Sequence, residues 1–87
     1  MPLEVSYSKQ AANYLKNLDA PTKRRVLEKV AEVSADYMDP RNSKPLEGSE
    51  KRSARVGKYR ILLLAVKEKN ALIVAEIASR GQVYRET

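Results

Sequence analysis

Two strongly apolar segments near the C-terminus, YRILLLAV (residues 59–66) and ALIVAEIAS (residues 71–79), are separated by only four residues, KEKN. Segments of this length, rich in branched apolar residues and bounded by polar turns, are typical of β-strands. A link this short joins antiparallel neighbours, because parallel neighbours need a crossover of roughly a dozen residues or more. A third segment, KRSARV (residues 51–56), precedes them across a turn at Gly57 and Lys58. The second half of the chain is therefore predicted to be an antiparallel meander.

The first half of the chain shows one strand pattern and two helix patterns. LEVSYS (residues 3–8) alternates apolar and polar side chains, which predicts a short strand at the edge of the sheet. Ser8 is placed to cap a helix over residues 9–18, and the apolar side chains at helical spacing there are Ala11, Tyr14, Leu15 and Leu18. A second helix is predicted within residues 19–38, with Pro21 in its first turn and an apolar face formed by Leu27, Val30, Ala31 and Val33.

These elements follow the order strand–helix–helix–strand–strand–strand, with a loop imposed by Pro40, Pro45 and Gly48 before the meander. The predicted fold class is α+β, with two N-terminal helices packed on an antiparallel sheet. A chain of 87 residues without an internal repeat or linker is expected to form one domain, residues 1–87. The segment ILLLAV is apolar throughout, so its strand should be central. The helices should cover one face of it, and the C-terminal tail or a partner the other.

Composition removes several kinds of chemistry. The chain has no cysteine and no histidine, which excludes disulfides, thiolate metal sites and histidine acid–base catalysis. No apolar run reaches membrane-spanning length and the N-terminus lacks a signal-peptide pattern, so a soluble, cytoplasmic protein is expected. Residues 1–40 hold six basic and six acidic side chains, whereas residues 41–87 hold eleven and five. This segregation indicates a surface for an anionic partner, with nucleic acid as the first candidate and an acidic protein as the second.

Basic side chains and one tyrosine are the candidate functional groups. Strand alternation places Lys51, Ser53 and Arg55 on one face of their strand. Arg60 either pairs with a carboxylate, lies at the rim of the sheet, or converges with Arg80 on a patch suited to a phosphate. Tyr84 either covers the end of the sheet, stacks on an unpaired base or takes part in proton transfer. The residue types alone predict a basic groove able to hold a phosphate.

Three segments resemble the RelE/ParE superfamily of toxin–antitoxin toxins in order and spacing: YSKQAANYLKNLDAPTKRRVLEKV, DPRNSKPLEGSEKRSARVGKYRILLLAV and IASRGQVYR. The most specific parts are RVGKYRIL and RGQVYR. A resemblance to the RelE-like branch implies a microbial-RNase-like fold and the activity of an mRNA interferase. Such an endoribonuclease cleaves mRNA on the ribosome by attack of the ribose 2′-hydroxyl on the adjacent phosphate, without a metal or other cofactor, and so inhibits translation.

Carried over by position, the resemblance implies catalytic roles for Arg60, Arg80, Tyr84 and Lys51. Arg60 and Arg80 match phosphate-binding arginines, and Tyr84 matches a tyrosine that stacks on or activates the substrate nucleotide. The RNA-binding residues implied are Lys51, Ser53, Arg55, Lys58 and Arg85. Two departures concern the general base, because better-studied relatives have a second lysine in place of Ser53 and many have a histidine in place of Ser79.

The resemblance also implies partners. These are an acidic cognate antitoxin, the ribosome with its mRNA, and operator DNA bound through the antitoxin, with no membrane involved. Two other functions fit the same superfamily. A ParE-like toxin would poison DNA gyrase without cutting RNA, although such toxins generally lack the set of two arginines and a tyrosine. A non-catalytic member would act as an antitoxin-binding corepressor.

Overall fold

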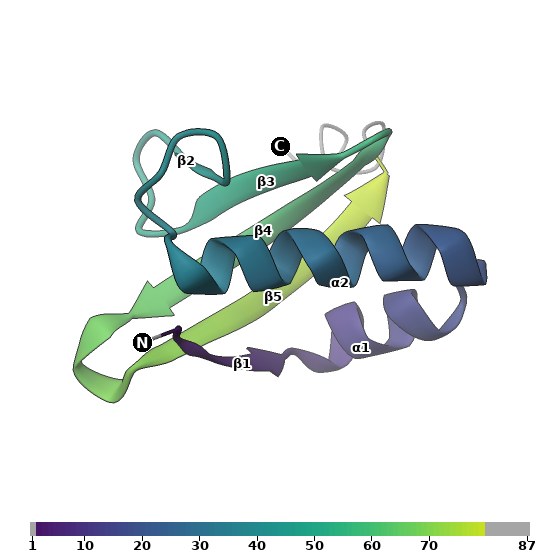
Figure 1. The fold of residues 1–87 in the computed structure, drawn as a ribbon, viewed down its shortest axis with the longest axis horizontal. Helices are drawn as coiled ribbons and strands as arrows, with labels where there is room; N and C mark the ends of the chain where they lie inside the picture. Colours follow the sequence, from purple (N-terminus) through teal and green to yellow (C-terminus); the bar gives the residue numbers. More distant parts are fainter. Residues whose placement is uncertain (1, 80–87) are drawn as a thin grey trace.

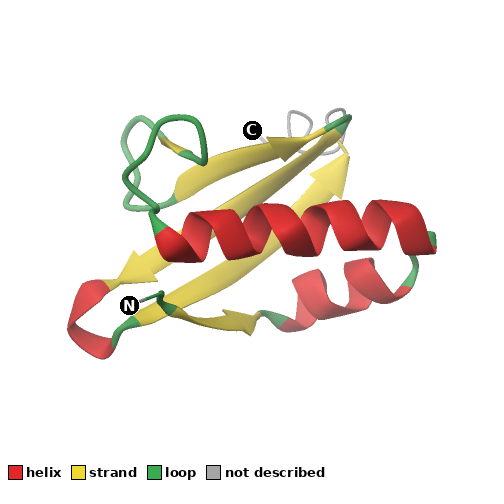
Figure 2. Cartoon of the chain, viewed as in Figure 1, coloured by secondary structure: helices red, strands yellow, loops and turns green. Residues whose placement is uncertain are grey.

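The computed structural model of the protein describes residues 2–79. Two helices lie over one face of a five-stranded sheet whose strand order is β1-β5-β4-β3-β2 (Figures 1 and 2). The elements are β1 (Glu4–Tyr7), α1 (Lys9–Lys16), α2 (Ala20–Ala35), β2 (Lys44–Pro45), β3 (Arg52–Val56), β4 (Tyr59–Val66) and β5 (Ala71–Ser79). This arrangement confirms the predicted α+β class and the predicted order of elements.

Each helix begins where its sequence predicts. The Ser8 hydroxyl accepts a hydrogen bond from the backbone N–H of Ala11 at 3.1 Å, and so caps α1. The Asp19 carboxylate accepts bonds from the backbone N–H and the hydroxyl of Thr22, at 3.1 and 3.0 Å, and so caps α2. Neither helix within the described part of the chain has the length and apolar character needed to cross a bilayer.

The predicted meander is present, since β3 pairs antiparallel with β4 and β4 with β5. The edge strand β1 pairs with β5 in parallel, from Glu4 opposite Ala71 to Tyr7 opposite Val74, so the sheet is mixed. The sequence pattern placed β1 at an edge but did not predict this direction. It also did not predict β2, a two-residue strand inside the expected loop.

The core lies between the sheet and the helices. Its fully buried members include Ile61 and Leu63 of β4, Leu72, Val74 and Ile77 of β5, and Val26, Val30 and Val33 of α2. The predicted apolar face of α2 is wrong in two positions, because Leu27 is 41% exposed and Ala31 also faces solvent. Val26 is buried in their place. Both sets of residues have helical spacing, so only packing against the sheet decides how the helix is rotated about its axis.

Beyond Val74, side chains of the segment that begins α1 replace β1 as the neighbour of β5. The Ser8 hydroxyl donates a hydrogen bond to the carbonyl of Ala75 at 2.7 Å. The Gln10 side-chain amide donates to the carbonyl of Ile77 at 2.8 Å and accepts from its N–H at 3.0 Å. These bonds satisfy backbone groups at the sheet edge and hold the last residues of β5, which ends at Ser79.

Candidate nucleic-acid interface

Basic side chains meet on the sheet face that points away from the helices. Ala54 and Val56 of β3 are buried under α2, so Ser53 and Arg55 lie on the opposite face, as strand alternation predicts. In the register of the sheet Arg55 is the direct partner of Arg60. Directly opposed side chains emerge on the same face with their Cβ atoms about 5 Å apart. Two guanidinium groups are therefore anchored side by side.

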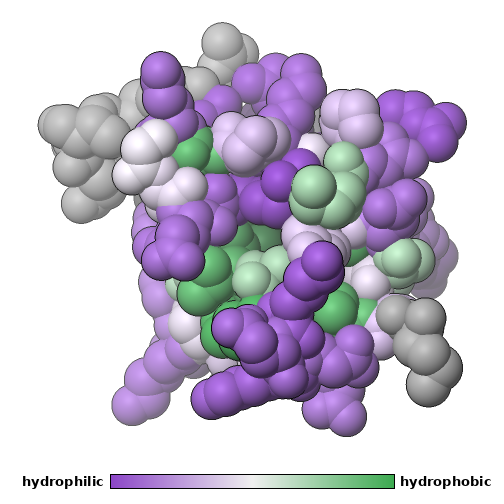
Figure 3. Space-filling view, turned by 90° about the vertical axis from the view of Figure 1, so that its left-hand side faces the viewer, coloured by the Kyte–Doolittle hydropathy of each residue, from purple (hydrophilic) through white to green (hydrophobic). Residues whose placement is uncertain are grey.

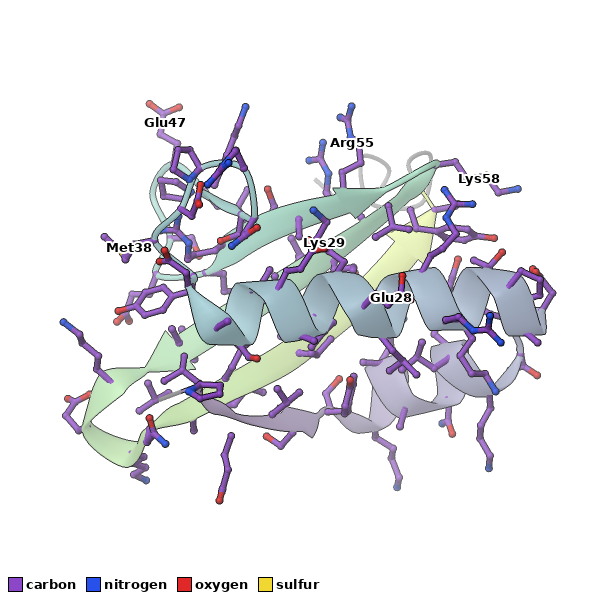
Figure 4. The ribbon with its side chains drawn as sticks, viewed as in Figure 1. Glu28, Lys29, Met38, Glu47, Arg55 and Lys58 are labelled. Carbon is purple, nitrogen blue, oxygen red and sulfur yellow. The ribbon has the colours of Figure 1, made fainter. Side chains whose placement is uncertain are left out.

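A hollow of about 320 Å³, here called the basic hollow, surrounds this pair. Its lining contains five cations, Lys29, Arg41, Lys44, Arg55 and Arg60, together with the neutral polar residues Asn42, Ser43 and Ser53. Among residues 2–79, no carboxylate belongs to this lining. Lys29 rises from α2 toward β3, while Arg55 extends outward from β3 (Figure 4). The hollow thus has the charge and the donors to hold an anion.

A second hollow of about 290 Å³ adjoins the first at the β3–β4 turn and is lined by Arg55, Gly57, Lys58, Tyr59 and Arg60. The turn depends on Gly57, whose φ of 56° is a conformation that other residues rarely adopt. The Lys58 ammonium lies 5.6 Å from the centre of the Tyr59 ring. Because Arg55 and Arg60 line both hollows, the basic surface is continuous around the turn.

The segment that supplies Lys44 is held against β3 by Arg52. The Arg52 guanidinium donates hydrogen bonds to the hydroxyl and the carbonyl of Ser43, at 2.8 and 3.0 Å. It also lies 5.8 Å from the centre of the Tyr37 ring, at the end of α2. Ser43 is the buried residue of this segment, with 2% of its surface exposed, and its hydroxyl donates to the carbonyl of Tyr37.

Two of the basic residues near the hollow have acidic partners. Arg41 donates hydrogen bonds from its guanidinium to both carboxylate oxygens of Asp39, at 3.2 and 2.8 Å. These bonds hold the pKa of Asp39 below its ordinary value and raise the pKa of Arg41. The Lys29 ammonium lies 3.3 Å from the Glu32 carboxylate. One partner of each pair, Glu32 and Arg41, is largely exposed, so solvent reaches both pairs and screens them, and the cations still contribute positive potential to the hollow.

The structure brings together four of the predicted site residues: Ser53, Arg55, Lys58 and Arg60. Lys51 precedes β3, and it does not line either hollow in the described part of the chain. Its backbone N–H donates to the Ser49 hydroxyl at 3.1 Å. Arg80, Tyr84 and Arg85 lie outside the described residues.

The sequence did not predict that Lys29, Arg41 and Lys44 belong to this site. The cluster of basic residues in the loop before the meander was a signal for two of them, since RNSK carries Arg41 and Lys44 just ahead of KRSAR. Lys29 had no such signal, because its position opposite β3 follows from the rotation of α2.

The same sheet face also carries apolar side chains. Leu62, Leu64 and Ile73 alternate with the buried core residues and are half-buried. Figure 3 looks along the sheet from the end of the molecule that carries the β4–β5 turn, and from this end hydrophobic side chains lie within a hydrophilic surround. The expectation of a strand that is apolar on both faces is therefore met, with basic residues at one end of the outer face.

This fold is that of the RelE toxins. A chain of the RelBE toxin–antitoxin complex from Mycobacterium tuberculosis is 26% identical with a TM-score of 0.78, and the match covers 92% of this chain and 100% of that one. The archaeal RelE–RelB complex from Pyrococcus horikoshii gives 23% identity and a TM-score of 0.78, covering 94% and 99%. A mutant of Escherichia coli RelE in the free state is 16% identical with a TM-score of 0.79, and the match covers 99% of this chain and 94% of that one.

A family model agrees with these structural matches. Residues 5–84 match the model of the ParE toxin of the parDE type II toxin–antitoxin system. The chain belongs to this family, within the RelE/ParE superfamily, and it is a RelE-like toxin of a type II toxin–antitoxin system. No curated protein sequence gives a significant match.

Proposed function

We propose that this toxin is a ribosome-dependent mRNA endoribonuclease, which cleaves messages as they are translated and so inhibits translation. The observation that supports this most directly is the pairing of Arg55 with Arg60 inside the basic hollow. Both guanidinium groups face the same hollow, where each offers a planar fork of N–H donors. An anion such as an RNA phosphate could accept charge-assisted hydrogen bonds from both of them.

The chemistry proposed is transesterification within the RNA strand. The 2′-oxygen forms a bond to phosphorus and the bond from phosphorus to the 5′-oxygen breaks, which leaves a 2′,3′-cyclic phosphate and a 5′-hydroxyl. The 2′-hydroxyl loses a proton to a base, and the leaving 5′-oxygen gains one. Negative charge grows on the phosphorus-bound oxygens, and Arg60 and Arg80 are assigned to stabilise it. Tyr84 is assigned to stack on or activate the substrate nucleotide. Lys51 is assigned to the catalytic and RNA-binding residues.

The proposed partners follow from charge and surface. An acidic antitoxin would cover the basic hollow and the half-buried apolar residues Leu62, Leu64 and Ile73. The solved complexes of RelE toxins with RelB antitoxins support an antitoxin as a partner. The antitoxin would also carry the toxin to operator DNA. Ribosomal RNA would be bound through phosphate contacts, and the toxin would act in the cytoplasm, where messages are translated.

Inhibition of DNA gyrase is the second candidate. It is favoured by one observation, the match of residues 5–84 to a family model named for ParE toxins. The arginine pair argues for the first candidate, because poisoning a protein target does not require a site built for a phosphate. A non-catalytic corepressor remains the third outcome of the experiment below.

The experiment is in vitro translation of a defined message, followed by primer extension, alongside a gyrase cleavage assay. Cuts at particular codons that disappear in Arg60→Ala and in Arg80→Ala, with naked RNA left intact, would support the proposal. Removal of a donor that stabilises the transition state lowers the rate by about 10²–10³-fold. An intact message together with stabilised gyrase–DNA complexes would replace it with the second candidate. No effect on either target would leave the corepressor.

A further inference from the structure

Lys44 lies directly opposite Ser53. The register of β2 and β3 makes the two residues Cα partners, so their side chains emerge on the same face of the sheet about 5 Å apart at Cβ. Both line the basic hollow together with Arg55 and Arg60. Position 53 itself carries no charge, although it is the central position on this face of β3. A cation is thus present at this point of the site, but it comes from the neighbouring strand.

The position of Lys44 depends on a small number of contacts. β2 has only two residues, and its second residue, Pro45, has no N–H to donate to a ladder. Arg52 supplies the side-chain ties between this segment and β3, namely its two hydrogen bonds to Ser43. They add to the β2–β3 pairing and to the hydrogen bond that the Leu46 N–H donates to the Lys51 carbonyl at 3.0 Å. Arg52 lies on the same face of β3 as Ala54, and it is not among the described residues that line the hollow. It therefore reaches the hollow only through the segment that it holds.

The lining of the hollow fits a phosphate better than an acidic peptide. Among its described residues the apolar members are only Pro40 and Ala54, whereas a peptide interface usually has large apolar anchors at its centre. Lys44 lies opposite Ser53 on β2, and Arg55 lies two residues after Ser53 on β3. Ammonium and guanidinium donors therefore lie on two sides of one small hydroxyl. This is an arrangement for an oxyanion with several acceptor oxygens.

We propose that Lys44 supplies, from the strand opposite, the phosphate-binding cation that position 53 lacks, and that Arg52 is the positioning residue that places it there. The inference rests on the proposed function for the identity of the ligand as RNA. Its distinguishing consequence is that a lysine at position 53 makes both Lys44 and Arg52 dispensable for binding, because position 53 belongs to β3 and needs no tie to Ser43.

The test uses the full-length toxin and two measurements. The first is cleavage of a translated message. The second is binding of a short fluorescein-labelled 2′-O-methyl oligoribonucleotide, which has no 2′-hydroxyl to react, over a series of salt concentrations. The single variants are Lys44→Gln, Lys44→Arg, Arg52→Gln and Ser53→Lys. The doubles combine Ser53→Lys with Lys44→Gln, Ser53→Lys with Arg52→Gln, and Lys44→Gln with Arg52→Gln. Lys16→Gln, on the exposed side of α1, is the control for a simple loss of charge.

We expect Lys44→Gln to weaken oligonucleotide binding about tenfold, the effect of one charge-assisted hydrogen bond, and to reduce the salt slope by about 0.7. Arg52→Gln should weaken oligonucleotide binding and reduce the salt slope by similar amounts, while the protein still unfolds cooperatively. Adding Lys44→Gln to Arg52→Gln should cause little further loss of oligonucleotide affinity. Ser53→Lys should restore both variants. Lys44→Arg should keep wild-type affinity.

Three results would overturn the inference. One is a Lys44→Gln variant that binds the oligonucleotide as the Lys16→Gln control does. Another is a loss that Ser53→Lys does not restore in either background. The third is a Lys44→Arg variant that loses affinity for the oligonucleotide as Lys44→Gln does. Failure of the proposed function gives a different result: the wild-type toxin would bind the oligonucleotide with the predicted Lys44 dependence, yet leave translated message intact.

Discussion

Arg55 and Arg60 are direct partners across β3 and β4, and both line the basic hollow. Two guanidinium groups that line one hollow form a site suited to an anion, and this supports a role in binding. The fold of the toxin accommodates both arginines because the other face of the same two strands carries the buried residues Ala54, Ile61 and Leu63.

Arg55→Gln should make the toxin less active while changing its stability little. Arg55 is exposed, and substitutions at such positions change the free energy of unfolding by no more than about 0.5 kcal/mol, which urea denaturation can measure. Cleavage of translated message should fall in the same variant. Lys16→Gln is the matched control, because it loses a favourable charge from the last turn of α1 and should lower stability slightly without changing cleavage. Cleavage by Arg55→Gln at the wild-type rate would contradict a role for Arg55 in the site.

Replacement of Lys51, Arg55 and Arg60 together by glutamine should weaken ribosome binding and flatten its dependence on salt. Each contact with a phosphate that is lost lowers the slope of log K against log salt by about 0.7–0.9. Ribosome pelleting across a salt series measures this slope. Because Lys51 does not line the hollows among the described residues, a variant that retains Lys51 should show most of the effect. Unchanged binding at every salt concentration would speak against a phosphate interface.

Two leucines offer a direct comparison of exposed and buried positions. Leu27→Ala, at a side chain that is 41% exposed, should change the free energy of unfolding by less than about 0.5 kcal/mol. Leu63→Ala, at a side chain with 0% exposure, should cost about 2–5 kcal/mol, since it leaves a cavity in the core. If urea denaturation showed that Leu27→Ala and Leu63→Ala lower the free energy of unfolding equally, Leu27 would be buried and α2 would be rotated differently about its axis.

Gln10 should stabilise the end of β5. Gln10→Ala leaves the N–H and carbonyl of Ile77 without their side-chain partner, at a cost of about 1–3 kcal/mol. Hydrogen exchange at the Ile77 amide should accelerate in this variant more than exchange in β3. Asn13→Ala, at an exposed position of the same helix, is the control and should leave that amide protected. Protection of Ile77 that survives in Gln10→Ala would show that β5 does not depend on this amide.

Asp19 should link stability to acid pH. The hydrogen bonds from the hydroxyl and backbone N–H of Thr22 lower the pKa of Asp19 from its ordinary value of 3.8. A lowered pKa in the folded state means that the stabilisation is present above the ordinary pKa and is lost as pH falls through the folded value. Asp19→Asn keeps a capping acceptor but does not titrate. This variant should therefore lose less stability than wild type between those two pH values. An NMR titration in which Asp19 has its ordinary pKa would contradict this.

Much of the architecture was readable from local patterns. The four-residue link KEKN required the strands on either side to be antiparallel, and β4 and β5 are so paired. Ser8 marked the start of α1 because only a few residue types satisfy the first free N–H groups of a helix, and Pro21 marked the first turn of α2. Alternation along β3 separated Ser53 and Arg55 from Ala54 and Val56, because successive side chains of a strand point to opposite faces.

Other features required contacts between distant parts of the chain. α2 carries two overlapping apolar stripes, and packing against the sheet chose Val26, Val30 and Val33 over Leu27 and Ala31. The parallel direction of β1 follows from where the two helices return the chain, which no local pattern encodes. The basic hollow has the same origin, since Lys29, Lys44 and Arg60 come from three separate elements.

By itself, then, the sequence determined the type and order of the elements, the face on which the basic residues of β3 lie, and the resemblance to RelE-like toxins. These depend on interactions between near neighbours in the chain, which residue type and spacing describe. Only the tertiary structure decided that Arg55 opposes Arg60 and that Lys44, tied down through Arg52 and Ser43, opposes Ser53. Such pairs depend on strand register, and register is set by packing of the whole sheet against its helices.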